Sequence, residues 1–307
     1  MKKIKMYAGL LLLIAILSAC STTANKSYTF EEVKNSKINH LHGMGYINGG
    51  PEIVISTHDG LYEYGNDGWK EANSEKHDYM GFQAIREGFF SSGHPEPGSN
   101  YKNPLGLVKS TDRGASFDQL AFYGEIDFHY LAAGYDSNAI YVLNETPTKD
   151  MPTGLHYSAD EGSTWKESSM NEFSSEYISN LAAHPTRKEM ITLGSKDGLF
   201  ISKDFGEKFS LFNKAKMVTY VTLTEAGGLY ANFEDEIVKL TLFAFDSDQE
   251  IEIQLPKKQQ IEPIAFIAVN PENQKEFAIA TYNNDIYLTK DEGLNWETLA
   301  ESGKLAK

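Results

Sequence analysis

The stretch SADEGSTW at residues 158–165 decides the fold, because its pattern of Ser/Thr, Asp, Gly and an aromatic residue occurs four times. The other copies occupy residues 110–117, 202–209 and 289–296. In each copy the Asp side chain can accept hydrogen bonds from backbone N–H groups just downstream, and the Gly can take a positive φ. The aromatic residue can anchor the strand that follows. Four copies therefore predict four tight turns between strands, placed in register along the chain.

The spacing of these turns gives the length of the repeating unit. Asp160 follows Asp112 by 48 residues, and Asp204 follows Asp160 by 44 residues. Asp291 comes 87 residues after Asp204, which corresponds to two units with one degenerate copy between them. A period in the forties with several short strands per unit is typical of a propeller blade. The chain is predicted to be all-β, a β-propeller of six blades of four antiparallel strands, with seven blades as the alternative.

The four turns resemble the Asp-box, or BNR, repeat of sialidase-like and sortilin-like β-propellers. The resemblance covers nearly all of the chain after its first residues. It implies a fold rather than a function, because the Asp box lies in a peripheral turn. Strand patterns and turn residues place the six blades at about 39–69, 79–120, 129–168, 178–212, 216–255 and 264–299.

The first twenty residues have the composition of an export signal. Three lysines precede a short apolar run at residues 7–17, which is shorter than the ~20 residues of a membrane span. The sequence LSAC at residues 17–20 resembles a bacterial lipobox, although a secretory signal with an incidental cysteine would look similar. We expect a signal peptide at 1–19, a lipidated Cys20 followed by a polar tether to residue 36, and a propeller at 37–307. The protein would then be anchored to the cell membrane and face outside the cytoplasm.

Charge and cysteine content narrow the possible partners. The net charge of −15 argues against a nucleic-acid partner, which would need a basic face. Cys20 is the single cysteine of the chain, so no disulfide can form within it. We expect a monomer whose stability comes from its core.

The histidines gather at one face of the predicted disc. The first strand of a blade begins, and the second ends, at the same face, here called the top face; the Asp turns lie on the opposite face. Five of the eight histidines fall at such strand ends, all in blades one to three: His40, His42, His58, His94 and His129. The other three are assigned to a loop between blades, a third strand and a His-Pro turn: His77, His156 and His184.

Five histidines on one rim suggest a transition-metal site, because neutral imidazole suits zinc, copper, nickel and iron. Met44 and Met80 lie nearby in the register, and a thioether would favour copper(I), so copper and zinc are the metals considered. Glu125, Asp127, Glu145 and Glu96 could act as ligands or as acceptors for the imidazole N–H groups. Two alternatives stay open: the histidines bind an organic ligand or form a catalytic cluster, or they share no site.

Four segments around these histidines resemble a bacterial family of exported propellers, commonly labelled glycosylhydrolase-like or sortilin-like: residues 40–45, 56–61, 92–95 and 124–129. The resemblance implies that the histidines belong together, and it establishes no reaction. The arginines argue against a sialidase, because those enzymes hold a substrate carboxylate with three arginines. Here the chain has Arg86, Arg113 and Arg187 alone, and the last two belong to the opposite face.

Whether the protein is an enzyme stays open. Another glycosidase would need two carboxylates roughly 5–9 Å apart. Glu125, Asp127 and Glu145 are the candidate catalytic acids on the top face, which would then bind a glycan in place of a metal or small ligand. A protein-interaction or assembly module is the third possibility, and a large apolar patch on the top face would favour it.

Overall fold

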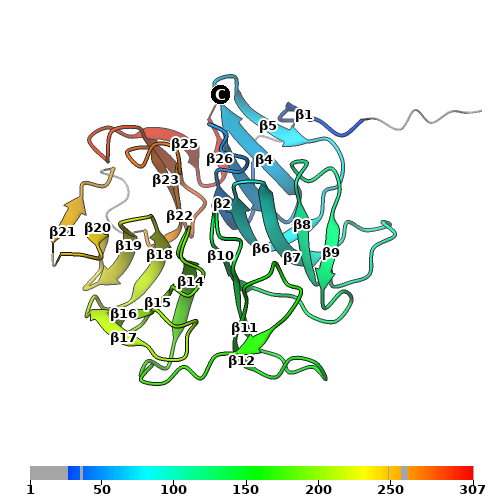
Figure 1. Cartoon of the computed structure of the whole chain (residues 1–307). Helices are drawn as coiled ribbons and strands as arrows, with labels where there is room; N and C mark the ends of the chain where they lie inside the picture. Colours follow the sequence, from blue (N-terminus) through cyan, green and yellow to red (C-terminus); the bar gives the residue numbers. More distant parts are fainter. Residues whose placement is uncertain (1–26, 35–36, 248, 257–261, 307) are drawn as a thin grey trace, which may run out of the picture.

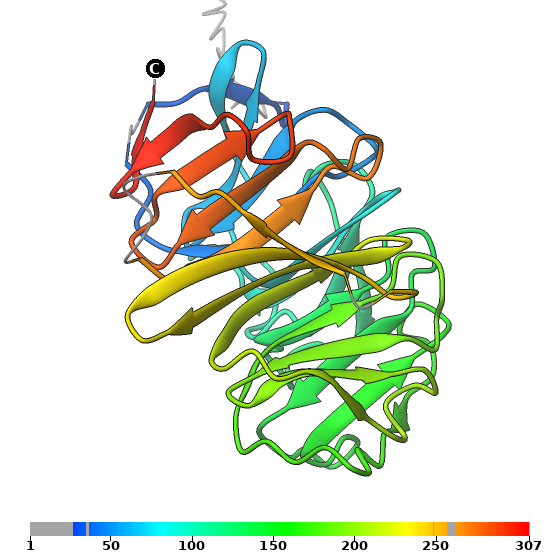
Figure 2. The same ribbon diagram turned by 90° about the vertical axis from the view of Figure 1, so that its left-hand side faces the viewer.

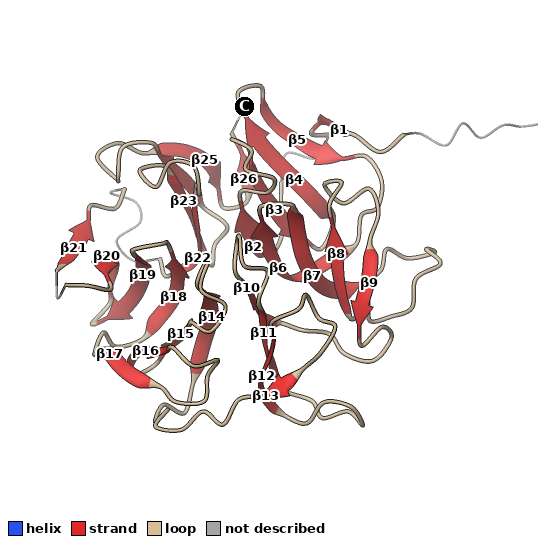
Figure 3. Ribbon diagram, in the orientation of Figure 1, coloured by secondary structure: helices blue, strands red, loops and turns tan. Residues whose placement is uncertain are grey.

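The structure, a computed structural model, describes residues 27–34, 37–247, 249–256 and 262–306. Within these ranges the strands form six antiparallel sheets arranged as a ring around a central axis (Figure 1). All regular elements in the described part of the chain are strands (Figure 3), so no helix there is long and apolar enough to cross a membrane. The predicted signal peptide and Cys20 lie outside the described residues.

Each blade holds four strands in chain order, with the first strand next to the axis. The strands of blades one to three are β2 (Leu41–Gly45), β3 (Ile53–Thr57), β4 (Gly60–Gly65), β5 (Gly68–Ala72); β6 (Asp78–Ile85), β7 (Gly88–His94), β8 (Leu107–Ser110), β9 (Asp118–Ala121); β10 (Tyr130–Ala133), β11 (Ile140–Asn144), β12 (Gly154–Ser158) and β13 (Lys166–Glu167). Those of blades four to six are β14 (Ile178–Ala183), β15 (Ile191–Ser195), β16 (Gly198–Ser202), β17 (Ser210–Asn213); β18 (Val218–Leu223), β19 (Gly227–Glu234), β20 (Ile237–Ala244), β21 (Glu250–Ile253); β22 (Ile264–Val269), β23 (Phe277–Thr281), β24 (Ile286–Thr289) and β25 (Glu297–Glu301).

The prediction of a six-bladed propeller is confirmed. Seen from the side, the sheets of blades six, five and four follow one another around the axis in reverse chain order (Figure 2). Blades one and six each carry a fifth strand at the outer edge, β1 (Phe30–Glu32) beside β5 and β26 (Lys304–Leu305) beside β25.

Strand β1 corrects the boundary expected for the tether. It lies within the segment 20–36, where the sequence showed no strand pattern, and its Phe30 pairs with Ala72 in antiparallel register. A three-residue strand is too short to show an alternating pattern by itself, and the exposed edge of β5 supplies the pairing partner. The first blade therefore begins before residue 37.

Contacts between the first and last blades close the ring. The indole Nε1 of Trp69 in β5 donates to the Leu299 carbonyl in β25 at 2.9 Å, and the Tyr64 hydroxyl donates to Glu297 at 2.6 Å. Trp69 belongs to a core cluster that combines side chains of both blades. The Ile38 N–H also donates to the Gly303 carbonyl at 2.9 Å. Apolar packing and hydrogen bonds thus join segments more than 200 residues apart in the sequence.

The four repeated turns have the hydrogen bonds that their sequence predicts. In the copy at 158–165, Asp160 accepts from the backbone N–H of Thr164 at 2.8 Å and from its hydroxyl at 2.7 Å. The Ser158 hydroxyl accepts from the N–H of Gly162 at 2.8 Å, and Gly162 has a φ of 86°. Hydrogen bonds from Thr164 lower the pKa of the Asp160 carboxyl. Asp112, Asp204 and Asp291 accept the equivalent backbone bonds in the other three turns.

A buried histidine on the opposite face makes the fold sensitive to acid. His184 follows β14 and is fully buried, and its Nδ1 accepts from the backbone N–H groups of Thr186 and Arg187 at 3.2 and 3.1 Å. Burial, helped by the charge of Arg187, lowers the pKa of His184 below its ordinary value of 6.5. Protonation therefore favours the unfolded chain, so this contribution is complete above about pH 6.5 and decreases as the pH falls toward the folded pKa.

We expect the melting temperature to decrease when the pH is lowered from 7.5 to 5.0. In a His184→Gln variant this decrease should be smaller by ~2 °C. His77 and His42 also have lowered pKa values through burial, so the variant keeps part of the dependence. The pKa of His129 is raised, so its protonation favours the folded chain and partly offsets the decrease in stability at low pH. Thermal melts followed by circular dichroism at the two pH values measure the difference. Equal decreases in wild type and variant would contradict a role for His184.

Candidate metal centre

The strand register brings the predicted histidines to one end of blades one to three. Leu41 pairs with Thr57 in blade one, and Asp78 pairs with His94 in blade two. In blade two the Asp turn follows Ser110, which pairs with Phe89 at the far end of β7. The histidine ends and the Asp turns therefore lie on opposite faces, as the sequence predicts. His94 is the last residue of β7, rather than a loop residue after it.

His42, His58 and Asp78 form a compact group, here called the first cluster. His42 Nε2 lies 3.2 Å from His58 Nδ1 and 3.3 Å from Asp78 Oδ1. His58 Nδ1 lies 2.8 Å from Asp78 Oδ2. The ligand atoms of the three residues all lie within 4.8 Å of one another, so together they can hold a metal ion. His40 stands beside them, with its ring centroid 5.1 Å from that of His58.

The electrostatics of the first cluster keep His42 neutral. Burial is the main cause that lowers the pKa of His42 from 6.5 to about 4; the Asp78 charge raises it, and the neighbouring histidines lower it. Its contact with Asp78 is therefore not an ion pair at neutral pH. A neutral imidazole offers the lone pair that a metal needs, and no proton has to leave His42 before binding.

His94, Asp127 and His129 form a second cluster on the same face. Asp127 Oδ2 lies 2.8 Å from His129 Nε2 and 3.3 Å from His94 Nε2. The hydrogen bond with Asp127 raises the pKa of His129. The carboxamide oxygen of Asn103 lies 2.6 Å from His94 Nδ1, where it accepts a hydrogen bond from the ring. This contact leaves Nε2 of His94 facing Asp127.

Each cluster also contains a buried carboxylate oxygen without a hydrogen bond. Asp78 Oδ1 and Asp127 Oδ1 are both buried in this way, although Asp78 Oδ1 has the Nε2 of His42 at 3.3 Å, without hydrogen-bond geometry. A buried anionic oxygen without a donor is costly unless a cation or a donor approaches it. Asp78 was not among the residues expected in the site. It occupies the start of an inner strand, as His42 and His129 do in their blades, and that position was the signal that could have identified it.

The other candidate residues divide between the site and its surroundings. Glu145 lines the top pocket together with His129, whereas Glu125 is exposed and does not line it. Met80 lines the same pocket, but Met44 is buried in the core and lines the cavity on the other side. Simple alternation would place Met44 on the same side of β2 as His42, but the strand register is irregular between Leu41 and Gly43, and Met44 packs in the core cluster of blades one and six. Copper(I) coordination by Met44 is therefore not supported.

Glu96, also considered as a ligand, is occupied elsewhere. Its backbone N–H donates to His77 Nδ1 at 2.8 Å, and its carboxylate accepts from the backbone N–H of Lys76 at 3.0 Å. His77 and His184 are fully buried, and His156 is 3% exposed on β12. All of these groups lie apart from the two clusters.

The pocket on the top face has a volume of about 460 Å³ and two different walls. His40 and His42 line it from blade one, and His129 from blade three. Tyr177 and Tyr282 line it from the segments beside β14 and β23, with 49% and 64% of their surfaces exposed. A metal bound at the histidine wall would therefore face an open, partly aromatic space.

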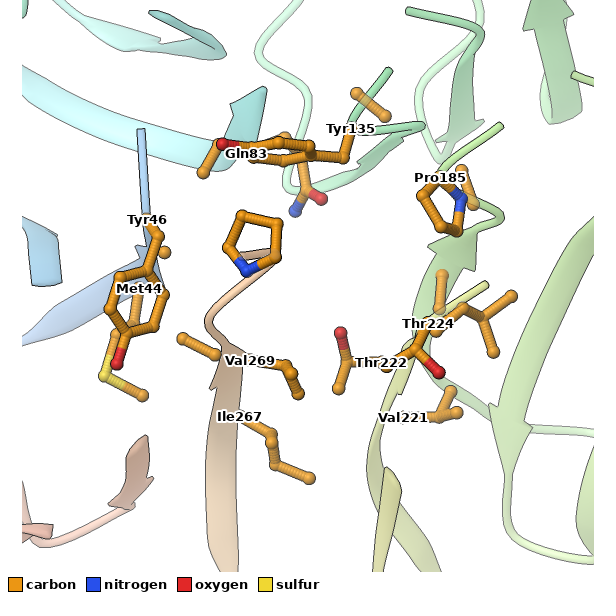
Figure 4. Close-up of a pocket in the computed structure, with 18 of the residues that line it drawn as sticks. Met44, Tyr46, Gln83, Tyr135, Pro185, Val221, Thr222, Thr224, Ile267 and Val269 are labelled. Carbon is orange, nitrogen blue, oxygen red and sulfur yellow. The ribbon is translucent and has the colours of Figure 1, made fainter. Parts of the chain in front are cut away.

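A second cavity of about 280 Å³ occupies the opposite half of the central channel. Figure 4 shows alkyl and hydroxyl groups around it, among them Ile267, Val269 and Thr222. Arg86 lines its mouth and pairs with Asp136 and with Glu272, the latter at 2.8 Å. Phe82, Gln83, Leu181 and Tyr220 line both cavities.

The three arginines do not meet in the top pocket. Arg113 pairs with Glu63, and Arg187 contacts His184, while Arg86 lines the second cavity. Each guanidinium is therefore engaged at a different place. This arrangement agrees with the expectation that no arginine triad of the sialidase kind is assembled.

Comparison with known proteins identifies the fold. No protein-family model and no curated protein sequence matches the chain. Among solved structures, it is similar to the GH74 enzyme of Niastella koreensis, with a TM-score of 0.56, 14% identity, and coverage of 89% of this chain and 47% of that one. The GH74 xyloglucanase of Xanthomonas campestris is similar with a TM-score of 0.52 and 15% identity, and the alignment covers 89% of this chain and 47% of that one. YCF48 bound to D1 peptide is similar with a TM-score of 0.50 and 13% identity, and the alignment covers 90% of this chain and 85% of that one.

These similarities concern the propeller fold. The chain spans about half the length of the GH74 enzymes that it matches, since the alignment covers 47% of each. At such low identity, neither the reaction of those enzymes nor the peptide bound by YCF48 transfers to this chain.

Proposed function

We propose that this propeller binds a transition-metal ion, zinc or copper, on its top face through His42, His58 and Asp78. The observation that carries the proposal is the convergence of two imidazole nitrogens and one carboxylate within 4.8 Å of one another. Three strand ends from two blades hold these groups. A ligand set built on strand ends of a rigid fold requires little rearrangement on binding.

The spacing of the donor atoms suits a small coordination sphere. Ligand atoms bonded to tetrahedral zinc at about 2.0–2.1 Å lie about 3.4 Å from each other. The contacts between His42 and His58, His42 and Asp78, and His58 and Asp78 measure 3.2, 3.3 and 2.8 Å. Small side-chain shifts would therefore admit an ion between them. Two imidazoles and a carboxylate suit zinc and copper(II).

Three protein ligands leave a coordination position open. The ring of His40 lies beside that of His58, with the ring centroids 5.1 Å apart, and would complete the sphere if it moved closer. Otherwise water or a small ligand from the top pocket would occupy the position, as in catalytic zinc sites. The open pocket and the exposed tyrosines opposite give such a ligand access.

The metal proposal has more direct support than a glycosidase or an assembly module. Asp127, one of the candidate catalytic acids, contacts two histidines. Glu125 lies outside the pocket, which leaves Glu145 as the remaining candidate acid along its wall. The similarity to GH74 enzymes and to YCF48 supports a shared fold and supplies no matching site residues.

Replacing Asp78 by asparagine is the direct test. Asp78→Asn keeps the size of the side chain and removes the anionic ligand, so zinc affinity at the first cluster should fall by more than about 100-fold, above the loss typical of an outer-shell change. The full chain, stripped with a chelator, is titrated with zinc chloride and then copper chloride by isothermal calorimetry. Glu125→Gln removes an exposed acid outside the pocket and serves as the matched control. Undiminished affinity in Asp78→Asn, or no binding in wild type, would overturn the proposal.

A further inference from the structure

We infer that the top face holds a second metal ion, bound by His94, Asp127 and His129 directly beside the first. This inference extends the proposed function, and it rests on a separate group of residues. Nε2 of His94 and Nε2 of His129 both approach Oδ2 of Asp127, at 3.3 and 2.8 Å. Asp127 thus contacts two imidazoles, which gives the same donor types as in the first cluster. Among the described residues only the first cluster has ligand atoms that all lie within 4.8 Å of one another, so the two imidazoles of the second cluster must move closer together to bind an ion.

The second cluster has the surroundings expected of a ligand group. Asn103 lies 2.6 Å from Nδ1 of His94, on the far side of the ring from Asp127. Since the carboxamide oxygen can only accept, Nδ1 carries the proton and Nε2 presents its lone pair toward Asp127. A hydrogen bond of this kind to the distal nitrogen orients metal-bound histidines in proteins.

Asp127 itself has bonding capacity left. Its Oδ1 is buried without a hydrogen-bond partner, while Oδ2 contacts both histidines. A cation would satisfy this oxygen, which no donor reaches. The side chain is 17% exposed, so an ion can still reach it from solvent.

The sheet of blade two places the clusters side by side. Asp78 of the first cluster and His94 of the second are directly paired across β6 and β7. Such residues have Cα atoms about 4.5–5.5 Å apart, and their side chains point to the same side of the sheet. One strand pair therefore supplies a ligand to each ion.

Both clusters also face one pocket. His42 from the first and His129 from the second line the same space of about 460 Å³, together with Glu145. Two cations in adjacent positions can share one bound ligand or bridging oxygen. Three carboxylates, Asp78, Asp127 and Glu145, offset the added positive charge.

Counting bound zinc tests the inference. The purified full chain is dialysed against buffered zinc chloride, and protein-bound zinc is measured by elemental analysis. We expect two equivalents in wild type and one in each of Asp127→Asn and Asp78→Asn. Circular dichroism and thermal melts check that the variants fold. If Asp127→Asn does not fold, His129→Gln replaces it, because the His129 side chain is 52% exposed.

The possible outcomes separate this inference from the proposed function. One equivalent in wild type that persists in Asp127→Asn but disappears in Asp78→Asn would overturn the second site and leave the first intact. One equivalent lost in both variants would mean a single shared ion, which also overturns the inference. Zinc retained in Asp78→Asn and lost in Asp127→Asn would overturn the first site instead. No zinc in wild type would overturn both.

Discussion

Replacing His42 and His129 together by alanine should abolish zinc binding under conditions where the wild type is saturated. The double variant removes one imidazole from each cluster, so each group retains a single imidazole and a carboxylate. Loss of an outer-shell partner alone costs about 10–100-fold in metal affinity, and loss of a ligand should exceed that at each cluster. Isothermal calorimetry and elemental analysis of the chelator-stripped chain measure the effect.

The same variant should keep its fold. The His129 side chain is 52% exposed, and that of His42 is 13% exposed at the mouth of the pocket. Tyr282→Ala, which changes the opposite wall of the pocket, is the matched control and should bind zinc like wild type. If the double variant unfolds, or binds zinc with wild-type affinity, the two histidines are structural and the metal proposal fails.

Replacing Trp69 by alanine should lower the free energy of unfolding by about 3–5 kcal/mol, the range for deleting a large aromatic side chain from a core. Trp69 is 6% exposed and packs in the cluster shared by blades one and six. Its deletion leaves a cavity where the ring closes and removes the hydrogen bond to the Leu299 carbonyl. Denaturant titration measures the change, and it is followed by far-UV circular dichroism rather than by fluorescence because the variant lacks a tryptophan.

Two further variants show whether packing or hydrogen bonding dominates at Trp69. Trp69→Phe keeps an aromatic ring and leaves a smaller cavity, so it should cost less than alanine. The Leu299 carbonyl loses the indole donor in both variants and still accepts from the Ala306 N–H at 2.8 Å. Leu294→Ala removes a side chain that is 82% exposed and should change stability by less than about 0.5 kcal/mol. A Trp69→Ala effect as small as that of Leu294→Ala would show that ring closure does not depend on this contact.

The repeated turns were predictable because their bonds are local. Asp160 binds Thr164, and Ser158 binds Gly162, four residues along the chain in each case. Such contacts need no information about distant segments, so the pattern of residue types is sufficient. The outer strand β1 was missed for the opposite reason: Phe30 gains its partner from Ala72, 42 residues away, across an edge that only the folded blade provides.

The sequence predicted the face on which the histidines lie, but not their division into two clusters. Alternation of strands places His42, His94 and His129 on one face, and this followed from the positions of the strand ends. The separation into two clusters depends on the side-by-side pairing of Asp78 with His94. The place of Asp78 at the start of an inner strand is the sequence signal that it shares with His42 and His129, whereas its residue type alone did not distinguish it from the other acidic residues of the chain.

The sequence by itself determined the propeller, with six blades preferred over seven, and the face on which the five histidines lie, because the repeated turns and the alternating direction of the strands can be followed along the chain. The tertiary structure decided which carboxylates meet these histidines, that Met44 packs into the core, and that Glu125 stays outside. Those choices depend on side chains brought within about 3 Å from different blades. Such proximity is set by the closure of the ring and by strand register, and a linear pattern does not contain it.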